Sequence, residues 1–317
     1  PFHLVSLAAT VCWSSWSALA GTPSPLQRDV YAIRPRYAVV MFGTNDIQSR
    51  DIHRYGANLL DIADTLARQG VIALFSSVPP RDDNADADLW VPRYNAVARG
   101  VAQSRRLPFI DLHRELVPLP RHGLGSDGIH MNVYTSASGA ARGCVFTSEG
   151  LRYGFNARNV ITLEALQRAT DVVERGRAAP DPNATRLTGE GTPASPFVVA
   201  SLPFADSRDT TRGGGRSIAR YSGCNSNADE SGAEFYYRIT VDRPTRVRAM
   251  VITRGTVDID VHLLRGGLTG DQCVARDDRV IVADLPAGAS YFVVDSFASS
   301  SVGLRAGEYL FVVTPEP

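Results

Sequence analysis

Two short polar strings, far apart in the chain, carry side chains suited to acid–base chemistry. The first, Gly43-Thr44-Asn45-Asp46, follows the apolar run from Tyr37 to Phe42. The amide of Asn45 can donate two N–H groups to a developing oxyanion without carrying a charge. The second, Asp127-Gly128-Ile129-His130, puts a carboxylate and an imidazole three residues apart. At that spacing Asp127 can hold one ring nitrogen of His130 while the other nitrogen takes a proton from a substrate.

Each of these residues also has a plain structural interpretation. An Asn after Gly-Thr can simply form a turn, because Asn commonly bonds its own backbone. Asp127 and His130 can be a surface ion pair, and Asp46 is better suited to tying down its loop. The order of the two strings, and the buried strand predicted before Asn45, favour a catalytic role for Asn45, Asp127 and His130.

The elements that would position these residues alternate between helix and strand. Periodic apolar residues and helix-ending signals predict helices at 27–34, 55–69 and 91–104, with irregular structure and a closing helix within 147–174. Continuously apolar runs predict strands at 36–42, 71–78 and 108–112. Such strands are covered on both faces, which predicts a parallel sheet. Ligands of these sheets gather at the carboxyl ends of the strands, so Asn45 and the loop leading to Asp127 should converge there.

On these strings and their order, residues 1–175 resemble the SGNH (GDSL-type) hydrolase family. The resemblance implies an α/β fold with a parallel-sheet sandwich, and a site built from Ser, Gly, Asn and His in separate blocks. Asn45 matches the third block, and Asp127 and His130 match the fifth. The implied reaction is ester hydrolysis through a serine acyl-enzyme, with no cofactor.

The chain departs from that family at the nucleophile. No Gly-Asp-Ser string precedes Asn45, and Ser6, 39 positions before Asn45, lacks the Gly-Asp that would shape a nucleophile turn. We therefore expect the nucleophile to lie upstream of this chain, and the fragment itself to be inactive. For the glycine of the second block, Cys12 and Gly21 both remain open. A Cys at that place keeps its backbone donor without strain only if its φ is negative.

Composition limits the classes of partner. The formal net charge is zero and the sequence pI is about 7.4, so the composition shows no excess of basic residues of the kind that binds nucleic acid. No apolar stretch approaches the roughly 20 residues of a membrane span. The expected partner is a small-molecule or polysaccharide ester.

The four cysteines, Cys12, Cys144, Cys224 and Cys273, have no spacing typical of a zinc site. Cys224 and Cys273 flank predicted strands of one later domain and are the expected disulfide pair. Cys12 and Cys144 are either bonded or two buried free thiols. A disulfide indicates an oxidising compartment.

A change of composition divides the chain. Residues 176–196 are rich in Pro, Gly and Ala and predict a linker. Residues 197–317 predict a smaller all-β sandwich, with strands at 234–241, 246–253, 258–264, 280–283, 290–297 and 308–314. The strings at 258–264, 285–291 and 307–310 resemble the bacterial pre-peptidase C-terminal domain, an accessory domain of secreted hydrolases.

Two acidic groups invite a calcium interpretation. The string 81–88 lacks the Gly and distal Glu of an EF-hand and predicts a solvated loop. Asp258, Asp260, Asp277 and Asp278 are interpreted as ordinary turn acids rather than as a calcium site.

Two functions follow as hypotheses. The first is a secreted or cell-surface bacterial esterase that uses Asn45, Asp127 and His130, with a β-sandwich that has a surface or matrix target. The alternative is a noncatalytic surface or matrix-binding protein that retains the hydrolase fold.

Overall fold

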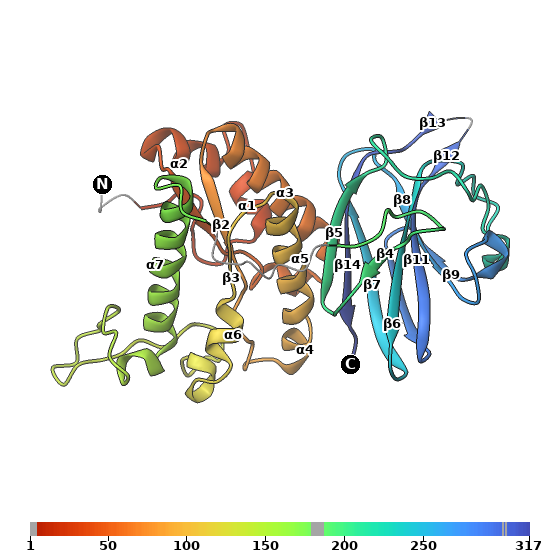
Figure 1. The fold of residues 1–317 in the computed structure, drawn as a ribbon. Coiled ribbons are helices and arrows are strands. Elements are labelled where there is room, and N and C mark those ends of the chain that lie inside the picture. The colour runs from red at the N-terminus through yellow and green to blue at the C-terminus, as the bar shows by residue number, and fades with distance from the viewer. Residues whose placement is uncertain (1–4, 179–186, 300, 302) are drawn as a thin grey trace. The chain divides into compact units, whose positions relative to one another are not determined.

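The computed structural model describes residues 5–178, 187–299, 301 and 303–317 (Figure 1). The chain divides into two compact units, Pro1–Pro182 and Asn183–Pro317. The division falls inside the segment 176–196 that composition assigned to a linker, although 179–186 lie outside the described residues.

The first unit is built around a three-stranded parallel sheet of order β1-β2-β3. This confirms the predicted parallel α/β arrangement. Each strand is shorter than its apolar run predicted, because the flanking residues already belong to loops. The strands are β1 (Tyr37–Val40), β2 (Ile72–Ser76) and β3 (Phe109–Ile110).

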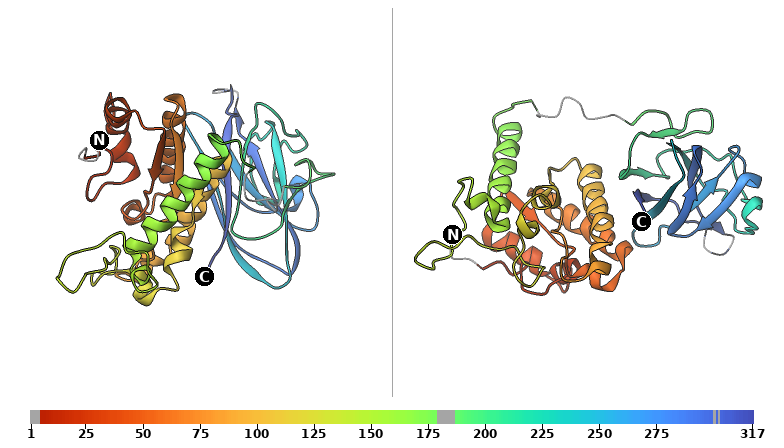
Figure 2. Two further views of the ribbon diagram at one scale, coloured as in Figure 1. Left: turned by 60° about the vertical axis from the view of Figure 1, so that its left-hand side comes forward. Right: turned by 90° about the horizontal axis from the view of Figure 1, so that it is seen from below.

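Helices cover both faces of this sheet (Figures 1 and 2). Ala169 of α7 is buried against Leu74 of β2 and Ile110 of β3 on one face. Helices α3 and α5 pack together and contact β2 on the other face. The helices are α1 (Ser15–Leu19), α2 (Pro25–Ile33), α3 (Ile52–Arg68), α4 (Ala85–Asp88), α5 (Val91–Ser104), α6 (Leu112–Leu116) and α7 (Gly154–Val173), with 3-10 turns η1 (Asp46–Ser49), η2 (Pro120–Gly123) and η3 (Gly150–Arg152).

Local sequence explains where these helices start. Ser24 accepts from the backbone N–H of Gln27, whose side chain accepts in turn from Ser24, so α2 opens with a capping box followed by Pro25. Asp51 caps α3 through Arg54 N–H. The capped ends lie just before the apolar periodicity begins, as helix-start signals predict.

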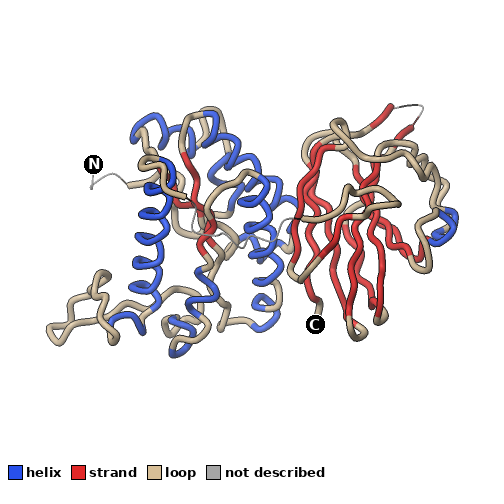
Figure 3. Tube along the Cα trace, in the orientation of Figure 1, coloured by secondary structure: helices blue, strands red, loops and turns tan. Residues whose placement is uncertain are grey.

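The second unit is rich in strands, as predicted (Figure 3). Most of these strands pair antiparallel. One sheet has the order β10-β7-β14-β5 and the other β4-β6-β11-β8-β9. Within the second sheet β4 pairs parallel with β6. The strands are β4 (Phe197–Val199), β5 (Phe204–Asp209), β6 (Glu234–Val241), β7 (Thr245–Thr253), β8 (Ile259–Leu264), β9 (Cys273–Asp277), β10 (Val280–Leu285), β11 (Gly288–Ser296), β12 (Ala298–Ser299), β13 (Gly303–Leu304) and β14 (Glu308–Pro315), with 3-10 turns η4 (Ser222–Cys224) and η5 (Gly270–Gln272).

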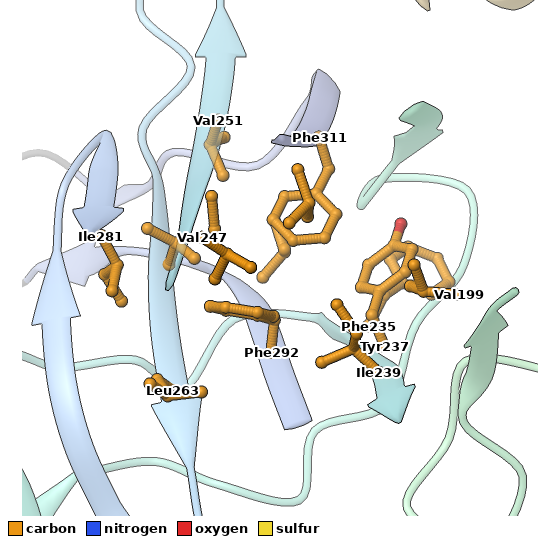
Figure 4. Packing of buried hydrophobic residues seen from close by; sticks show 14 of the residues in the cluster. Val199, Phe235, Tyr237, Ile239, Val247, Val251, Leu263, Ile281, Phe292 and Phe311 are labelled. Atoms are coloured by element: carbon orange, nitrogen blue, oxygen red, sulfur yellow. The ribbon is translucent and has the colours of Figure 1, made fainter. Parts of the chain in front are cut away.

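One hydrophobic cluster joins the two larger sheets (Figure 4). Phe292 and Val294 of β11 face Phe311 of β14 and Val247 of β7, and all four side chains are buried. Alternate residues of each strand point to this core, the pattern of a sheet packed on one face. The opposite face of β8 and β11 is also buried, and it carries polar residues such as Asp260, His262 and Asp295.

Part of the segment assigned to the linker packs against the second unit. Leu187 lies against the core cluster, and Gly191 approaches the rings of Phe197 and Phe235 so closely that a Cβ would lie 2.4 Å from the first ring. Residues 187–196 therefore form part of the β unit despite their Pro/Gly-rich composition.

The predicted disulfide is present between Cys224 and Cys273. Cys12 and Cys144 are both free, and both are exposed. Neither open alternative for this second pair, a disulfide or two buried thiols, describes them.

No helix among the described residues is long and apolar enough to cross a membrane.

Candidate active site

Asp127 and His130 form a direct pair. Nδ1 of His130 lies 2.7 Å from Oδ2 of Asp127, and Oδ1 of Asp127 accepts from the backbone N–H groups of Ile129 and His130. The carboxylate thus holds its own loop and one ring nitrogen at once. The imidazole is exposed, with 79% of its side chain accessible, so Nε2 can be reached from outside. The pair has the geometry of an imidazole oriented by an acid.

These contacts set the acidity of Asp127. The hydrogen bond to His130, followed by the two backbone N–H bonds, lowers the pKa of the carboxyl to about 2 from its ordinary 3.8. Each contact favours the charged form. Asp127 is therefore ionised across the neutral pH range.

Asn45 lies in the loop after β1 and is half-buried. Its Nδ2 donates to the carbonyl of Trp13 at 2.9 Å, which fixes the direction of the amide. Because an amide nitrogen carries two hydrogens, one N–H remains for another acceptor. The neighbouring Asp46 is buried and accepts from the backbone N–H and the hydroxyl of Ser15. Asp46 thus ties the loop to the start of α1, as its predicted structural role required.

A buried arginine joins the loops that carry the two strings. Arg81 donates to the carbonyl of Thr44 at 2.9 Å and forms a salt bridge with Asp83 at 2.7 Å, and its side chain is only 6% exposed. The next loop is held to the same segment, because Asp82 N–H donates to the carbonyl of Gly128. Arg81 to Asp83 therefore connect the residue before Asn45 with the loop of Asp127 and His130.

Gly128 makes the second of these connections possible. Its φ is +69°, and a Cβ built there would lie 2.7 Å from the backbone nitrogen of Asp83. Only glycine tolerates this combination of backbone conformation and close approach.

Ser6 is engaged elsewhere. Its hydroxyl donates to Asp29 at 2.6 Å, and Asp29 also accepts from the backbone N–H groups of Leu7 and Ala8. This carboxylate organises a loop turn. Among the described residues, no hydroxyl is hydrogen-bonded to Nε2 of His130.

The two positions open for the second block differ in their surroundings. Cys12 directly precedes Trp13, whose carbonyl accepts from Asn45. Gly21 lies after α1, and nothing approaches within 4 Å of the place of a Cβ. Cys12 has a φ of +64°, the conformation that favours glycine, so the condition of a negative φ is not met. The structure brings the Cys12 segment beside Asn45.

Sequence reasoning missed Arg81 and a second carboxylate–imidazole pair. Nδ1 of His122 lies 2.8 Å from Oδ1 of Asp82, in the segment that holds Gly128. The two residues are 40 positions apart, and no spacing rule could have joined them. Arg81 lies in an acidic string whose composition indicates a solvated loop. Its burial depends on a tertiary contact with Thr44, which the sequence does not reveal.

The acidic string 81–88 is held by internal contacts rather than left as a free ligand set. Besides the Arg81–Asp83 pair, Asn84 caps α4 and Asp86 pairs with Arg50. Among the described residues, the side chains that could hold a metal form one group, and it lies in the second unit.

Comparison with known proteins finds a similarity in the first part of the chain. Residues 9–135 match the model of the GDSL-like lipase/acylhydrolase family. No curated protein is significantly similar to the chain.

Several solved structures resemble half of the chain or less. A GDSL-like lipase from Bacteroides thetaiotaomicron has 18% identity and a TM-score of 0.38, and the match covers 50% of this chain and 73% of that one. An acetylxylan esterase from Geobacillus stearothermophilus has 14% identity and a TM-score of 0.37, with 49% and 68% covered. A variant of that esterase has 16% identity and a TM-score of 0.33, and the match covers 38% of this chain and 62% of that one. The chain therefore spans less than two thirds of that variant. These similarities are too low to carry an argument about activity.

The matched segment contains the Asn45 and Asp127–His130 strings together with the loops that join them. Residues 9–135 are therefore similar to the GDSL-like lipase/acylhydrolase family.

Proposed function

We propose that this chain belongs to a secreted bacterial SGNH-type esterase, which hydrolyses a carboxylic ester or O-acyl group through a serine acyl-enzyme. The observation that carries the proposal is the Asp127–His130 pair, because its carboxylate holds Nδ1 and leaves Nε2 exposed. The family match of the surrounding segment supports the same class of reaction.

Each residue has a defined part in the proposed reaction. Nε2 of His130 takes the proton of the attacking serine and returns it to the leaving alcohol. Asp127 keeps the ring in the tautomer that makes this transfer possible. The free N–H of Asn45 stabilises the tetrahedral oxyanion.

The nucleophile is proposed to lie in a segment outside these 317 residues. Two observations support this placement. Ser6 is bonded to Asp29, and no described hydroxyl meets Nε2 of His130. The upstream coding sequence should then contain a Gly-Asp-Ser string after an apolar strand.

The residues 197–317 are proposed to be a pre-peptidase-like accessory domain that binds a surface or matrix target. The disulfide between Cys224 and Cys273 supports an oxidising, extracytoplasmic location. The substrate is a small-molecule or polysaccharide ester, and the proposed reaction uses no cofactor.

The test compares the 317-residue chain with a chain extended upstream. Both are incubated with p-nitrophenyl acetate and with a fluorophosphonate probe. The extended chain should hydrolyse the ester and be labelled on its upstream serine, and His130→Ala should abolish turnover. The shorter chain should do neither.

Two results would overturn the proposal. Ester hydrolysis by the shorter chain that is lost in His130→Ala would show that the nucleophile lies within it, and labelling would then identify the serine. An extended chain that is folded but neither labelled nor active would instead favour the noncatalytic surface-binding protein.

A further inference from the structure

A row of charged side chains is buried on the outer face of the sheet β4-β6-β11-β8-β9. In β8, Ile259, Val261 and Leu263 belong to the hydrophobic core, so the alternate residues Asp260 and His262 point to the other face. Asp260 is paired in register with Asp295 of β11. These three polar residues are at most 2% exposed.

The segment 216–233, the later part of the connection between β5 and β6, lies over this face and is called the cover segment. The ring of Tyr221 stacks on the imidazole of His262, with centroids 3.4 Å apart and an interplanar angle of 7°. The Tyr221 hydroxyl donates to Asp295 at 2.7 Å. Cys224 fastens the same segment to β9 through its disulfide with Cys273. The cover segment thus excludes water from the polar face.

The cover segment also adds a third charged group. Glu230 is fully buried and lies next to Asp260 and His262, and one ligand atom from each of the three residues lies within 4.8 Å of the other two. Among the described residues this is the one such group. It joins one residue of the cover segment to two residues of a core strand.

Several polar atoms of this group lack the partners that buried groups require. His262 is fully buried, and neither ring nitrogen has a hydrogen bond. Oε2 of Glu230 is likewise buried without a partner. Leaving such atoms unsatisfied is unfavourable, so each calls for an explanation. The buried, unpaired ring nitrogens of His262 thus point to a ligand independently of the acidic residues.

Arg276 offsets only part of the negative charge. Its Nη2 donates to Oε1 of Glu230 at 3.0 Å and also to Asp260. One guanidinium therefore serves two carboxylates. A second cation beside the group would offset the charge that remains.

We propose that Glu230, Asp260 and His262 bind a divalent first-row transition metal such as Zn²⁺, which holds the cover segment on the sheet. The donor set carries this choice, because an imidazole nitrogen with carboxylate oxygens suits zinc and its neighbours. Calcium prefers a shell of oxygen ligands. The site is independent of the proposed ester chemistry.

The first experiment measures zinc bound to the full 317-residue chain. The protein is stripped with a chelator, incubated with Zn²⁺, passed through a desalting column and analysed by mass spectrometry of the metal. The wild-type chain should retain about one zinc ion, and His262→Gln and Glu230→Gln should not. The zinc affinity of each variant should fall at least roughly tenfold, because removing even a residue that only supports a metal ligand has an effect of that size. Asp258→Asn is the matched control, because Asp258 lies beside the same strand but outside the group, and it should retain the metal.

The second experiment does not depend on variants. All three tryptophans, Trp13, Trp16 and Trp90, lie in the first unit, so tryptophan fluorescence follows that unit alone. Zinc should raise the melting temperature seen by circular dichroism of the strands of the second unit. The melting temperature reported by tryptophan fluorescence should not change.

Three results would overturn the proposal. The first is that the wild-type protein retains no zinc. The second is that His262→Gln retains as much zinc as the wild type. The third is that Ca²⁺ but not Zn²⁺ stabilises the second unit. In the first case Arg276 and a proton on Glu230 would account for the buried charge.

Discussion

At the residue scale, Asp127 and His130 show how a local motif determines its own geometry. They lie three positions apart, and the carboxylate bonds both the backbone and the ring of the same short loop. The pair could therefore be predicted from sequence. Arg81 could not, because its burial depends on Thr44, which is 37 positions away.

The acidity of Asp127 gives a test of this pair. Its pKa of about 2 in the folded protein lies below the ordinary 3.8, so its stabilising contribution is present above pH 3.8 and is lost as pH falls through about 2. NMR titration of the carboxyl carbon should give a midpoint near 2. In His130→Ala the midpoint should rise toward 3.8, because the bond to His130 is the largest cause of the shift.

Asp229 is the control for that titration. The side chain and backbone of Ser231 lower its pKa, and it lies in the second unit. His130→Ala should leave its midpoint unchanged. An unchanged midpoint for Asp127 in the same variant would mean that the ring does not hold the carboxylate in solution.

Cys12 gives a second prediction at this scale. At a φ of +64° a side chain costs roughly 1–2 kcal/mol that glycine avoids. Cys12→Gly should therefore raise the free energy of unfolding of the first unit, by about 1 kcal/mol after the greater chain entropy of glycine is subtracted. Cys12→Val should lower it. Tryptophan-monitored urea unfolding measures both, and equal stability of the two variants would contradict the backbone argument.

At the element scale, the sequence predicted which segments are regular better than where they end. The α5 helix spans the predicted residues 91–104, and β6 spans the predicted 234–241. The strands β5 and β9 were missed. Both strands begin with apolar residues and end with charged ones, without a sustained apolar run. Their pairing depends on partners such as β14 and β8 rather than on their own pattern.

The contact between two loops of the first unit can be tested at Gly128. Gly128→Ala adds a Cβ that meets the backbone of Asp82 and Asp83, with the nearest atom at 2.7 Å. Gly21→Ala is the matched control, because its φ is also positive but nothing lies within 4 Å. Both should be destabilised by the backbone term, and Gly128→Ala by about 1–3 kcal/mol more. Equal urea midpoints would show that the loops do not pack this closely.

Arg81 tests the same connection from its other end. Arg81→Ala removes the bonds from the buried guanidinium to Thr44 and Asp83, so it should lower the free energy of unfolding by about 1.5–3 kcal/mol. Arg114→Ala removes an arginine whose side chain is 75% exposed in its pair with Glu115, and should cost about 0–1 kcal/mol. Urea unfolding followed by tryptophan fluorescence compares the two. A loss for Arg81→Ala no greater than for Arg114→Ala would remove Arg81 from its proposed organising role.

At the scale of the whole molecule, composition predicts a linker at 176–196, and the structure packs part of that segment with the second compact unit. Leu187 and Gly191 belong to the β unit because they pack against its core, Gly191 against Phe197 and Phe235, contacts that a Pro/Gly-rich string does not reveal. The cover segment was equally invisible. It lacks apolar alternation, and it is held by a disulfide, a stacked ring and buried carboxylates rather than by strand pairing.

The disulfide between Cys224 and Cys273 should stabilise the second unit alone, because both cysteines lie in that unit. Cys224 and Cys273 are 49 residues apart, and closing a loop of that length stabilises by about 4 kcal/mol in the chain-entropy model. A reducing agent should therefore lower the melting temperature that circular dichroism reports for the β unit. The tryptophan-monitored transition should not move, since every tryptophan lies in the first unit. Cys224→Ala with Cys273→Ala should reproduce the effect without reductant, whereas Cys12→Ala should not. A tryptophan transition that falls together with the other would show that the two units unfold as one cooperative body.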